Sequence, residues 1–241
     1  MRNITLSIAA ALLVVFAWPT ISRAGFIGNL LTIEAAADGD VDTLEIALPP
    51  GKGKLHWKIE KKHEFRGKGQ GKHLGFLDDM EVDLDGDPAV NLAFVATAGN
   101  SGTTFTITSA VVSFPALVNP FAVASAEVTL TDSSTDGAAL TPISPRVGMF
   151  VALYNFGATD FAQLLGPQSL SSGGTLTASE GTGIQTIAGS VSDIQALFRF
   201  YLSANDSVTG HGHFEVAIPE PVSGGLLLIG VAGLLLRRRP A

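Results

Sequence analysis

The sequence contains no cysteine, and only 15% of its 241 residues are charged, against about 25% in an average protein. The first absence excludes disulfides, thiolate zinc sites and cysteine nucleophiles. The formal net charge of −7 gives no sign of a nucleic-acid-binding protein. A chain of this length is long enough for one large β domain or two small ones, and it must be held together by its core or by bound ions.

Recognisable catalytic motifs are also missing. No Gly-x-Ser-x-Gly nucleophile elbow occurs, and "GKGQGK" at 67–72 lacks the spacing of a phosphate-binding loop. His63-Glu64 begins like a zinc-protease helix, but Gly67 stands where the second histidine belongs. Sequence spacing does not exclude a glycosidase, although two tyrosines and two tryptophans supply few aromatic surfaces for sugar. The sequence therefore predicts a protein that is not an enzyme, with a secreted hydrolase as the least favoured alternative.

The N-terminus, "MRNITLSIAAALLVVFAWPTISRAGF", has the pattern of a secretory signal peptide. Arg2 supplies the positive region, residues 4–18 are apolar, and Ser22 and Ala24 are the small residues that signal peptidase prefers. Residues 1–24 are thus predicted to be removed after export through the Sec machinery, with cleavage between Ala24 and Gly25. The alternative is an uncleaved membrane anchor.

The C-terminus combines a stiff triplet, an apolar run and a basic end. Residues 222–236 carry no charge and would form a helix of about 22 Å, shorter than the ~30 Å hydrocarbon core of a bilayer. Modest bilayer thinning compensates for such a difference. The arginines at the end should stay cytoplasmic, which leaves the body on the far side, where a signal peptide would also send it. Residues 218–241 are predicted to be a membrane-inserted tail.

This tail resembles the PEP-CTERM sorting signal of Gram-negative bacteria. The matching residues are Pro219, Glu220 and Pro221, a leucine-rich span, and then Arg237, Arg238 and Arg239. The resemblance implies that a membrane protease, exosortase, recognises the triplet and processes the tail. It also implies a transient inner-membrane anchor, followed by delivery to the cell surface or to an extracellular matrix rich in exopolysaccharide. The resemblance covers about the last 23 residues and is silent on the chemistry of the body.

The positive charge of the body is concentrated between residues 52 and 72. Eight lysines and arginines fall there, whereas Arg146 and Arg199 are the other two between residues 25 and 217. Such a patch can attract an anionic surface polymer such as an acidic exopolysaccharide, and an ordinary solvated hairpin is the alternative. The candidate contacts are Lys58, Lys61, Lys62, Arg66 and Lys68.

An acidic run, "DDMEVDLDGD" at 78–87, follows directly. Asp83, Asp85 and Asp87 alternate, so an extended strand would present them on one face, where a hard cation such as Ca²⁺ would find oxygen ligands. The spacing does not fit an EF-hand loop. The alternative is that this run pairs with the basic run before it. Apart from this possible Ca²⁺, the sequence predicts no cofactor.

Residues 88–217 alternate apolar and polar side chains between clusters of Gly, Asn, Asp and Ser, which predicts about eight or nine strands. The expected fold is all-β, an antiparallel β-sandwich of the jelly-roll or immunoglobulin-like kind, with residues 25–87 as part of it. Residues 158–165 are the one expected short helix. His211 and His213 should share one strand face, but no third metal ligand is evident, so an inert role is favoured.

These observations predict an exported, structural or adhesive protein associated with exopolysaccharide. The alternative is a calcium-dependent carbohydrate-binding module.

Overall fold

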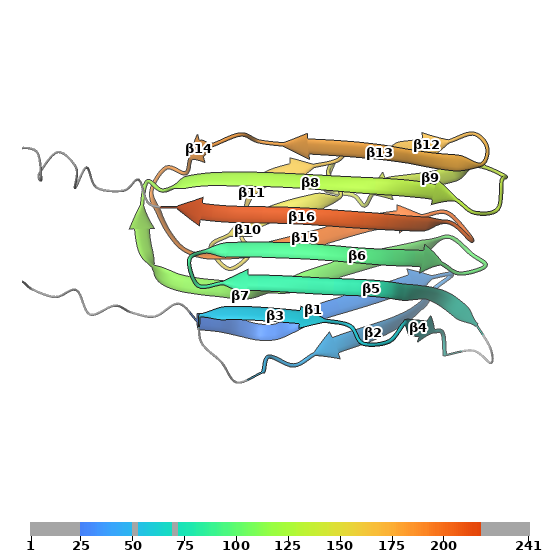
Figure 1. Ribbon diagram of the computed structural model, residues 1–241, viewed down its shortest axis with the longest axis horizontal. Coiled ribbons are helices and arrows are strands. Elements are labelled where there is room, and N and C mark those ends of the chain that lie inside the picture. The colour runs from blue at the N-terminus through green and yellow to red at the C-terminus, as the bar shows by residue number, and fades with distance from the viewer. Residues whose placement is uncertain (1–24, 50–52, 69–71, 218–241) are drawn as a thin grey trace, which may run out of the picture.

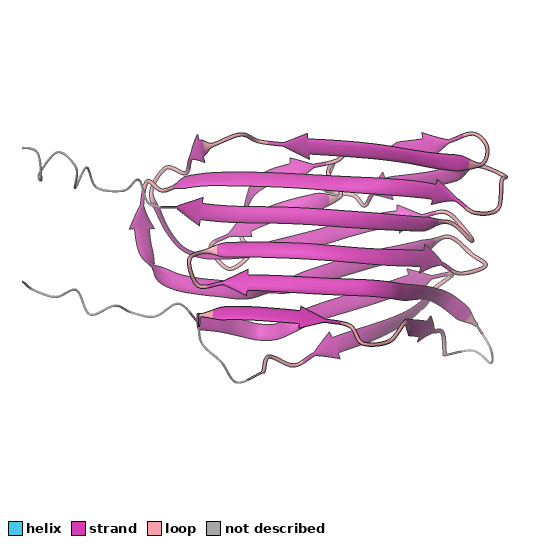
Figure 2. Ribbon diagram, viewed as in Figure 1, coloured by secondary structure: helices cyan, strands magenta, loops and turns pink. Residues whose placement is uncertain are grey.

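The computed structural model describes residues 25–49, 53–68 and 72–217, and all of the regular structure in these ranges is strand (Figure 2). The sixteen strands form two antiparallel sheets of eight strands each, which face one another as a sandwich (Figure 1). The predicted all-β sandwich is confirmed at this level. The predicted signal peptide and sorting tail lie outside the described residues. Within these residues, no helix has the length and apolar character needed to cross a membrane.

The first sheet, sheet A, has the order β11-β10-β15-β7-β1-β2, with β9 added beside β15 and β12 beside β9. Its long central strands are β1, β7 and β15. The bounds are β1 Gly25–Ala37, β2 Asp40–Ile46, β7 Thr103–Val118, β9 Ala138–Pro142, β10 Phe150–Tyr154, β11 Thr159–Leu164, β12 Gln168–Leu170 and β15 Ser190–Leu202.

The second sheet, sheet B, has the order β13-β8-β16-β6-β5-β3, with β14 added beside β8 and β4 beside β5. It is the nearer layer in Figure 1. The bounds are β3 Lys54–Lys58, β4 His63–Arg66, β5 His73–Asp85, β6 Ala89–Ala98, β8 Phe121–Asp132, β13 Gly174–Gly181, β14 Gln185–Thr186 and β16 Ser207–Ala217.

Strand periodicity places one face of each sheet in a common core. In β6, for example, Val90, Leu92 and Phe94 are buried, while Asn91 between them is exposed. Phenylalanines from both sheets meet at the centre. The ring of Phe94 on sheet B lies 4.9 Å from that of Phe198 on sheet A, measured between centroids. Aromatic pairs of this kind stabilise the packing of the two sheets against each other.

The expected helix at 158–165 is wrong, because Thr159–Leu164 forms β11 at the edge of sheet A. The segment pairs with β10, a buried strand whose backbone N–H and C=O groups need hydrogen-bond partners on that side. Phe161 reaches across the sandwich and stacks on Phe214 of β16, with ring centroids 5.3 Å apart. Tertiary packing therefore overrides a local helical pattern that is only two turns long.

Residues 25–87 contribute strands to both sheets. β1 pairs with β7 in sheet A, and β5 pairs with β6 in sheet B, so strands from this segment are hydrogen-bonded to strands of residues 88–217. Gly25 begins β1 and Ala217 ends β16, and both residues lie at the same end of the sandwich (Figure 1). The segments predicted to be processed therefore attach at one end, and the broad faces of the sheets lie to the side.

Candidate functional site

The acidic run lies beside the first half of the basic run, strand against strand. Leu55 and Trp57 of β3 pack on the core, so the residues between them face outward. In the pairing of β3 with β5, Lys54 lies opposite Asp85, His56 opposite Asp83 and Lys58 opposite Glu81. The sequence allowed two interpretations of the acidic run, a cation site or pairing with the basic run. The contacts among the described residues are those of the pairing.

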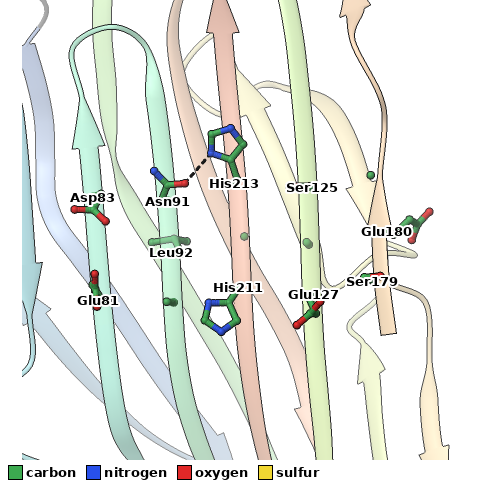
Figure 3. Close-up of a pocket in the computed structure, with 14 residues that line it drawn as sticks. Glu81, Asp83, Asn91, Leu92, Ser125, Glu127, Ser179, Glu180, His211 and His213 are labelled. Carbon is green, nitrogen blue, oxygen red and sulfur yellow. Dashed lines mark hydrogen bonds between the residues drawn. The ribbon is translucent and has the colours of Figure 1, made fainter. Parts of the chain in front are cut away.

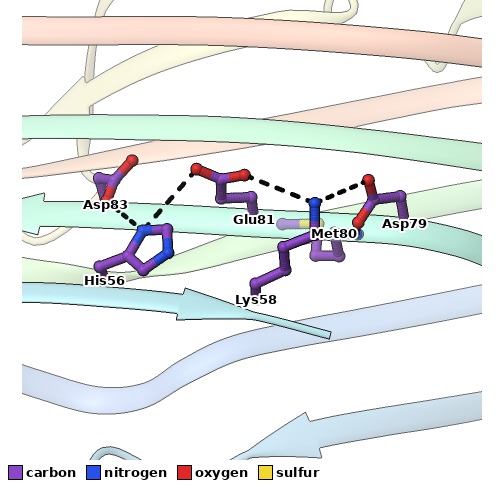
Figure 4. Close-up of polar contacts among 6 residues, drawn as sticks. All are labelled: His56, Lys58, Asp79, Met80, Glu81 and Asp83. Carbon is purple, nitrogen blue, oxygen red and sulfur yellow. Dashed lines mark hydrogen bonds and ion pairs between the residues drawn. The ribbon is translucent and has the colours of Figure 1, made fainter. Parts of the chain in front are cut away.

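Close contacts follow from this register (Figure 4). Lys54 Nζ lies 2.6 Å from Asp85 Oδ2, and His56 Nδ1 lies 2.7 Å from Asp83 Oδ1. Lys58 Nζ lies 3.2 Å from Asp79 Oδ2. The carboxyl of Asp85 is partly desolvated, which opposes ionisation, but its hydrogen bond from Lys54 and backbone N–H donors outweigh this and lower its pKa.

The second half of the basic run is paired in the same way. Lys62 Nζ lies 2.7 Å from Asp78 Oδ1 and also 3.5 Å from the ring centroid of Phe76. The Arg66 guanidinium donates to Glu64 over 2.6 Å, and this hydrogen bond lowers the pKa of Glu64. The two cations are exposed and the two carboxylates are half-buried, so solvent and salt screen their attraction.

Three of the five residues predicted to bind an anionic polymer, Lys58, Lys62 and Arg66, therefore already contact carboxylates of the same chain. Lys61 and Lys68 are exposed. Binding of a polyanion to this set stays a prediction. Its expected strength is lower than the bare count of charges indicates, because three of the cations would have to exchange a partner.

The three predicted metal ligands lie at the end of β5 and just beyond it, and binding of a cation to them stays a prediction. Asp83 and Asp85 share the outward face of β5, whereas Asp87 lies beyond the end of the strand and donates its N–H to Asp85. Within the described residues, His56, Glu81 and Asp83 instead bring their ligand atoms within 4.8 Å of one another. One imidazole and two carboxylates suit a transition metal better than Ca²⁺, which prefers oxygen ligands alone.

A groove of about 540 Å³ crosses the outer face of sheet B (Figure 3). At its centre is β16, where glycine and histidine alternate. Gly210 and Gly212 face the core, so His211 and His213 face outward into the groove. His213 Nδ1 is 2.7 Å from Asn91 Oδ1, and its Nε2 is 3.4 Å from Glu215 Oε2.

Register aligns the outward residues of neighbouring strands into two rows across the sheet. Each row takes one residue from each of β3, β5, β6, β16, β8 and β13, and successive residues are register partners on neighbouring strands. The first row runs through Lys58, Glu81, Ala93, His211, Glu127 and Ser179. The second row runs through His56, Asp83, Asn91, His213, Ser125 and Gly181.

The sizes of the side chains in these rows explain the groove. Ala93 in the first row and Ser125 and Gly181 in the second are small, and they leave space between the larger histidine and carboxylate side chains. The exposed groups offer hydroxyl, amide, imidazole and carboxylate hydrogen bonding on one surface. Such a surface can bind a polar ligand that lies flat across several strands.

Sequence reasoning identified the shared face of His211 and His213 but not the groove. Asn91, Ser125 and Glu127 stand on β6 and β8, which are the two strands on either side of β16. The signal that could have found them is the polar residue at an outward position within an apolar strand. Their meeting depends on strand order, which the local pattern does not encode.

Comparison with protein-family models and with curated proteins yields no match. Two solved structures are similar over 68% of this chain, each at 10% identity and a TM-score of 0.27. One is TmCBM61 in complex with β-1,4-galactotriose, of which 86% is covered. The other is the enzymatically active domain of tailspike protein 4 of bacteriophage CBA120, of which 19% is covered. Similarity at this level carries no argument about the function of this chain.

Proposed function

We propose that this protein is an exported, non-catalytic polysaccharide-binding β-sandwich of the cell surface or extracellular matrix, and that the groove on sheet B is its binding site. The observation that carries the proposal is the open polar groove with its two aligned rows. Its volume lies within the range of about 300–1,000 Å³ that is typical of ligand sites. Sugars present many hydroxyl groups, and the groove presents matching donors and acceptors from Asn91, His211 and Glu127.

The arrangement of acidic residues favours binding over hydrolysis. Glu127 and Glu81 stand in the same row three strands apart, so their backbones are about 14 Å apart at the usual strand spacing. Paired glycosidase carboxylates are roughly 5–9.5 Å apart. Glu81 and Asp83 lie closer to one another, but both already contact His56. This cluster is open to solvent, because the His56 side chain is 60% exposed. The proposal is therefore a binding protein.

Delivery to the surface rests on the two ends of the sequence. The proposed route is export with removal of residues 1–24, transient anchoring by residues 222–236, and processing by exosortase at Pro219-Glu220-Pro221. Both attachment points, Gly25 and Ala217, are at one end of the sandwich, whereas the groove lies on the side face of sheet B. An anchored body would thus keep the groove open to solvent.

Binding can be tested with two groove substitutions. We expect the Asn91→Ala, His211→Ala double variant of the full chain to bind an N-acetylglucosamine hexasaccharide or the producing cells' extracted exopolysaccharide at least about tenfold more weakly, since two hydrogen-bonding groups are lost. Isothermal titration calorimetry measures the affinity, and Thr43→Ala on sheet A is the matched control. The proposal is wrong if the unaltered protein binds neither probe, or if it releases reducing ends from them.

Processing can be tested by mass spectrometry of the protein recovered from its native cells. We expect an N-terminus at Gly25 and the loss of Arg237, Arg238 and Arg239. Replacement of Pro219, Glu220 and Pro221 by alanine should leave these arginines in place, because the extended peptide that the protease would bind is lost. A native product that retains its arginines would contradict exosortase processing and leave the binding proposal standing.

A further inference from the structure

The charges around the groove have one sign. Of the described residues that line it, four are acidic, none is lysine or arginine, and two are histidines. The acidic residues are Glu81, Asp83, Glu127 and Glu180. Carboxylates along a concave surface repel anionic polymers and attract cations, and the shape of the surface concentrates the field.

Glu127 is the carboxylate that is best placed to meet a ligand. It is exposed near the middle of β8, with His211 of β16 on one side and Ser179 of β13 on the other. No ion pair within the described ranges involves it. The other three are engaged: Glu81 and Asp83 contact His56, and Glu180 accepts a hydrogen bond from the Leu165 N–H over 2.6 Å.

The neighbours of Glu127 favour an ammonium group over a hydroxyl at that position. An ammonium has three N–H donors, and the nearest row positions supply a carboxylate, a Ser179 hydroxyl and the His211 imidazole as acceptors. A charge-assisted hydrogen bond is roughly twice as strong as a neutral one. Glu81 provides a second carboxylate about 14 Å farther along the same row, within reach of a polymer but not of a single sugar.

We propose that the groove selects a glycan that carries free amino groups, such as a glucosamine polymer, over neutral and acidic glycans. This inference rests on the proposed binding function and names its ligand class. The basic residues 52–72 predict an anionic ligand, whereas this inference assigns a cationic ligand to the groove. The lysines and arginines of that segment that have described ion pairs contact carboxylates of this chain, and none of them lines the groove.

The test compares hexasaccharides that share one backbone. Calorimetry on the full chain would measure binding of a glucosamine hexasaccharide, at a pH where its amines are protonated, and of its fully N-acetylated form, with an alginate oligosaccharide as the acidic probe. We expect the amine form to bind about tenfold more tightly than the acetylated form, a difference of ~1.4 kcal/mol, and the alginate not to bind. The preference should shrink at high salt, because the attraction is electrostatic and partly exposed.

A charge-neutral variant locates the effect. Glu127→Gln should reduce the preference for the amine form to threefold or less, because the carboxylate is lost while the size of the side chain is kept. Glu45→Gln, which removes an exposed carboxylate from β2 on sheet A, should leave the preference unchanged. Equal or tighter binding of the acetylated form overturns this inference but supports the proposed function. Binding of alginate alone overturns the ligand class in the same way, and the absence of binding to every probe overturns both proposals.

Discussion

Phe198→Ala is expected to lower the free energy of unfolding by about 3–5 kcal/mol. Phe198 is completely buried on β15, and its ring centroid lies 4.9 Å from that of Phe94 and 4.9 Å from that of Phe150. Truncation to alanine removes contacts with both rings and leaves a cavity between the sheets. Because the sequence has no cysteine, no disulfide can compensate for the lost packing. Equilibrium denaturation in urea, followed by far-UV circular dichroism, measures the change.

The matched control is Phe156→Ala. Phe156 has 66% of its surface exposed, so its truncation should change the stability by no more than about 0.5 kcal/mol. An equal loss in the two variants would mean that the aromatic contacts between sheets A and B do not determine the stability of the sandwich.

Local sequence pattern predicted the strands well where one face is buried. In β8, for example, small and aliphatic residues at 122, 124, 126, 128 and 130 are buried, and the residues between them are not. This alternation predicts a strand regardless of its partners. Where the alternation is weak, as in β11, local sequence favoured a helix and only pairing with β10 decided the outcome.

Strand order was beyond the reach of the same reasoning. β7 and β8 follow one another in the chain but lie in different sheets, and β15 and β16 do so again. The groove requires that β16 lie between β6 and β8, which brings His211 next to Ala93 and Glu127. These contacts join residues more than eighty positions apart, and their pairing is set by packing of the whole core rather than by any local preference.

The pairing of charges between β3 and β5 was predictable only in part. Alternation predicted that Asp83 and Asp85 share a face, and they do. The register that places His56 against Asp83 was not predictable, because a shift of two residues in β3 would keep Leu55 and Trp57 on the core and pair different charges. Burial of these two apolar side chains therefore decides which face the charges occupy, and packing of the whole sheet decides which cations meet which carboxylates.

Gly212→Ala is expected to lower the free energy of unfolding by about 1–3 kcal/mol, because the core has no room for the added methyl group. A Cβ atom at Gly212 would stand 2.4 Å from Cε2 of Phe150 and 2.7 Å from Cε2 of Phe198. Both rings are buried among other aromatic side chains, so the strand must move outward instead. The outward shift carries His211 and His213 with it, and glycan binding in the groove should weaken as well.

The neighbouring substitution separates the two effects. His211→Ala on the same strand removes an exposed side chain, so it should leave stability within about 0.5 kcal/mol and still weaken binding. Urea denaturation and calorimetry on both variants would measure stability and affinity independently. If Gly212→Ala were as stable as the unaltered protein, close packing of β16 against Phe150 and Phe198 would not be what holds the histidines in the groove. If the shape of the groove depends on the core beneath it, Gly212→Ala should lose both stability and binding, whereas His211→Ala should lose binding alone.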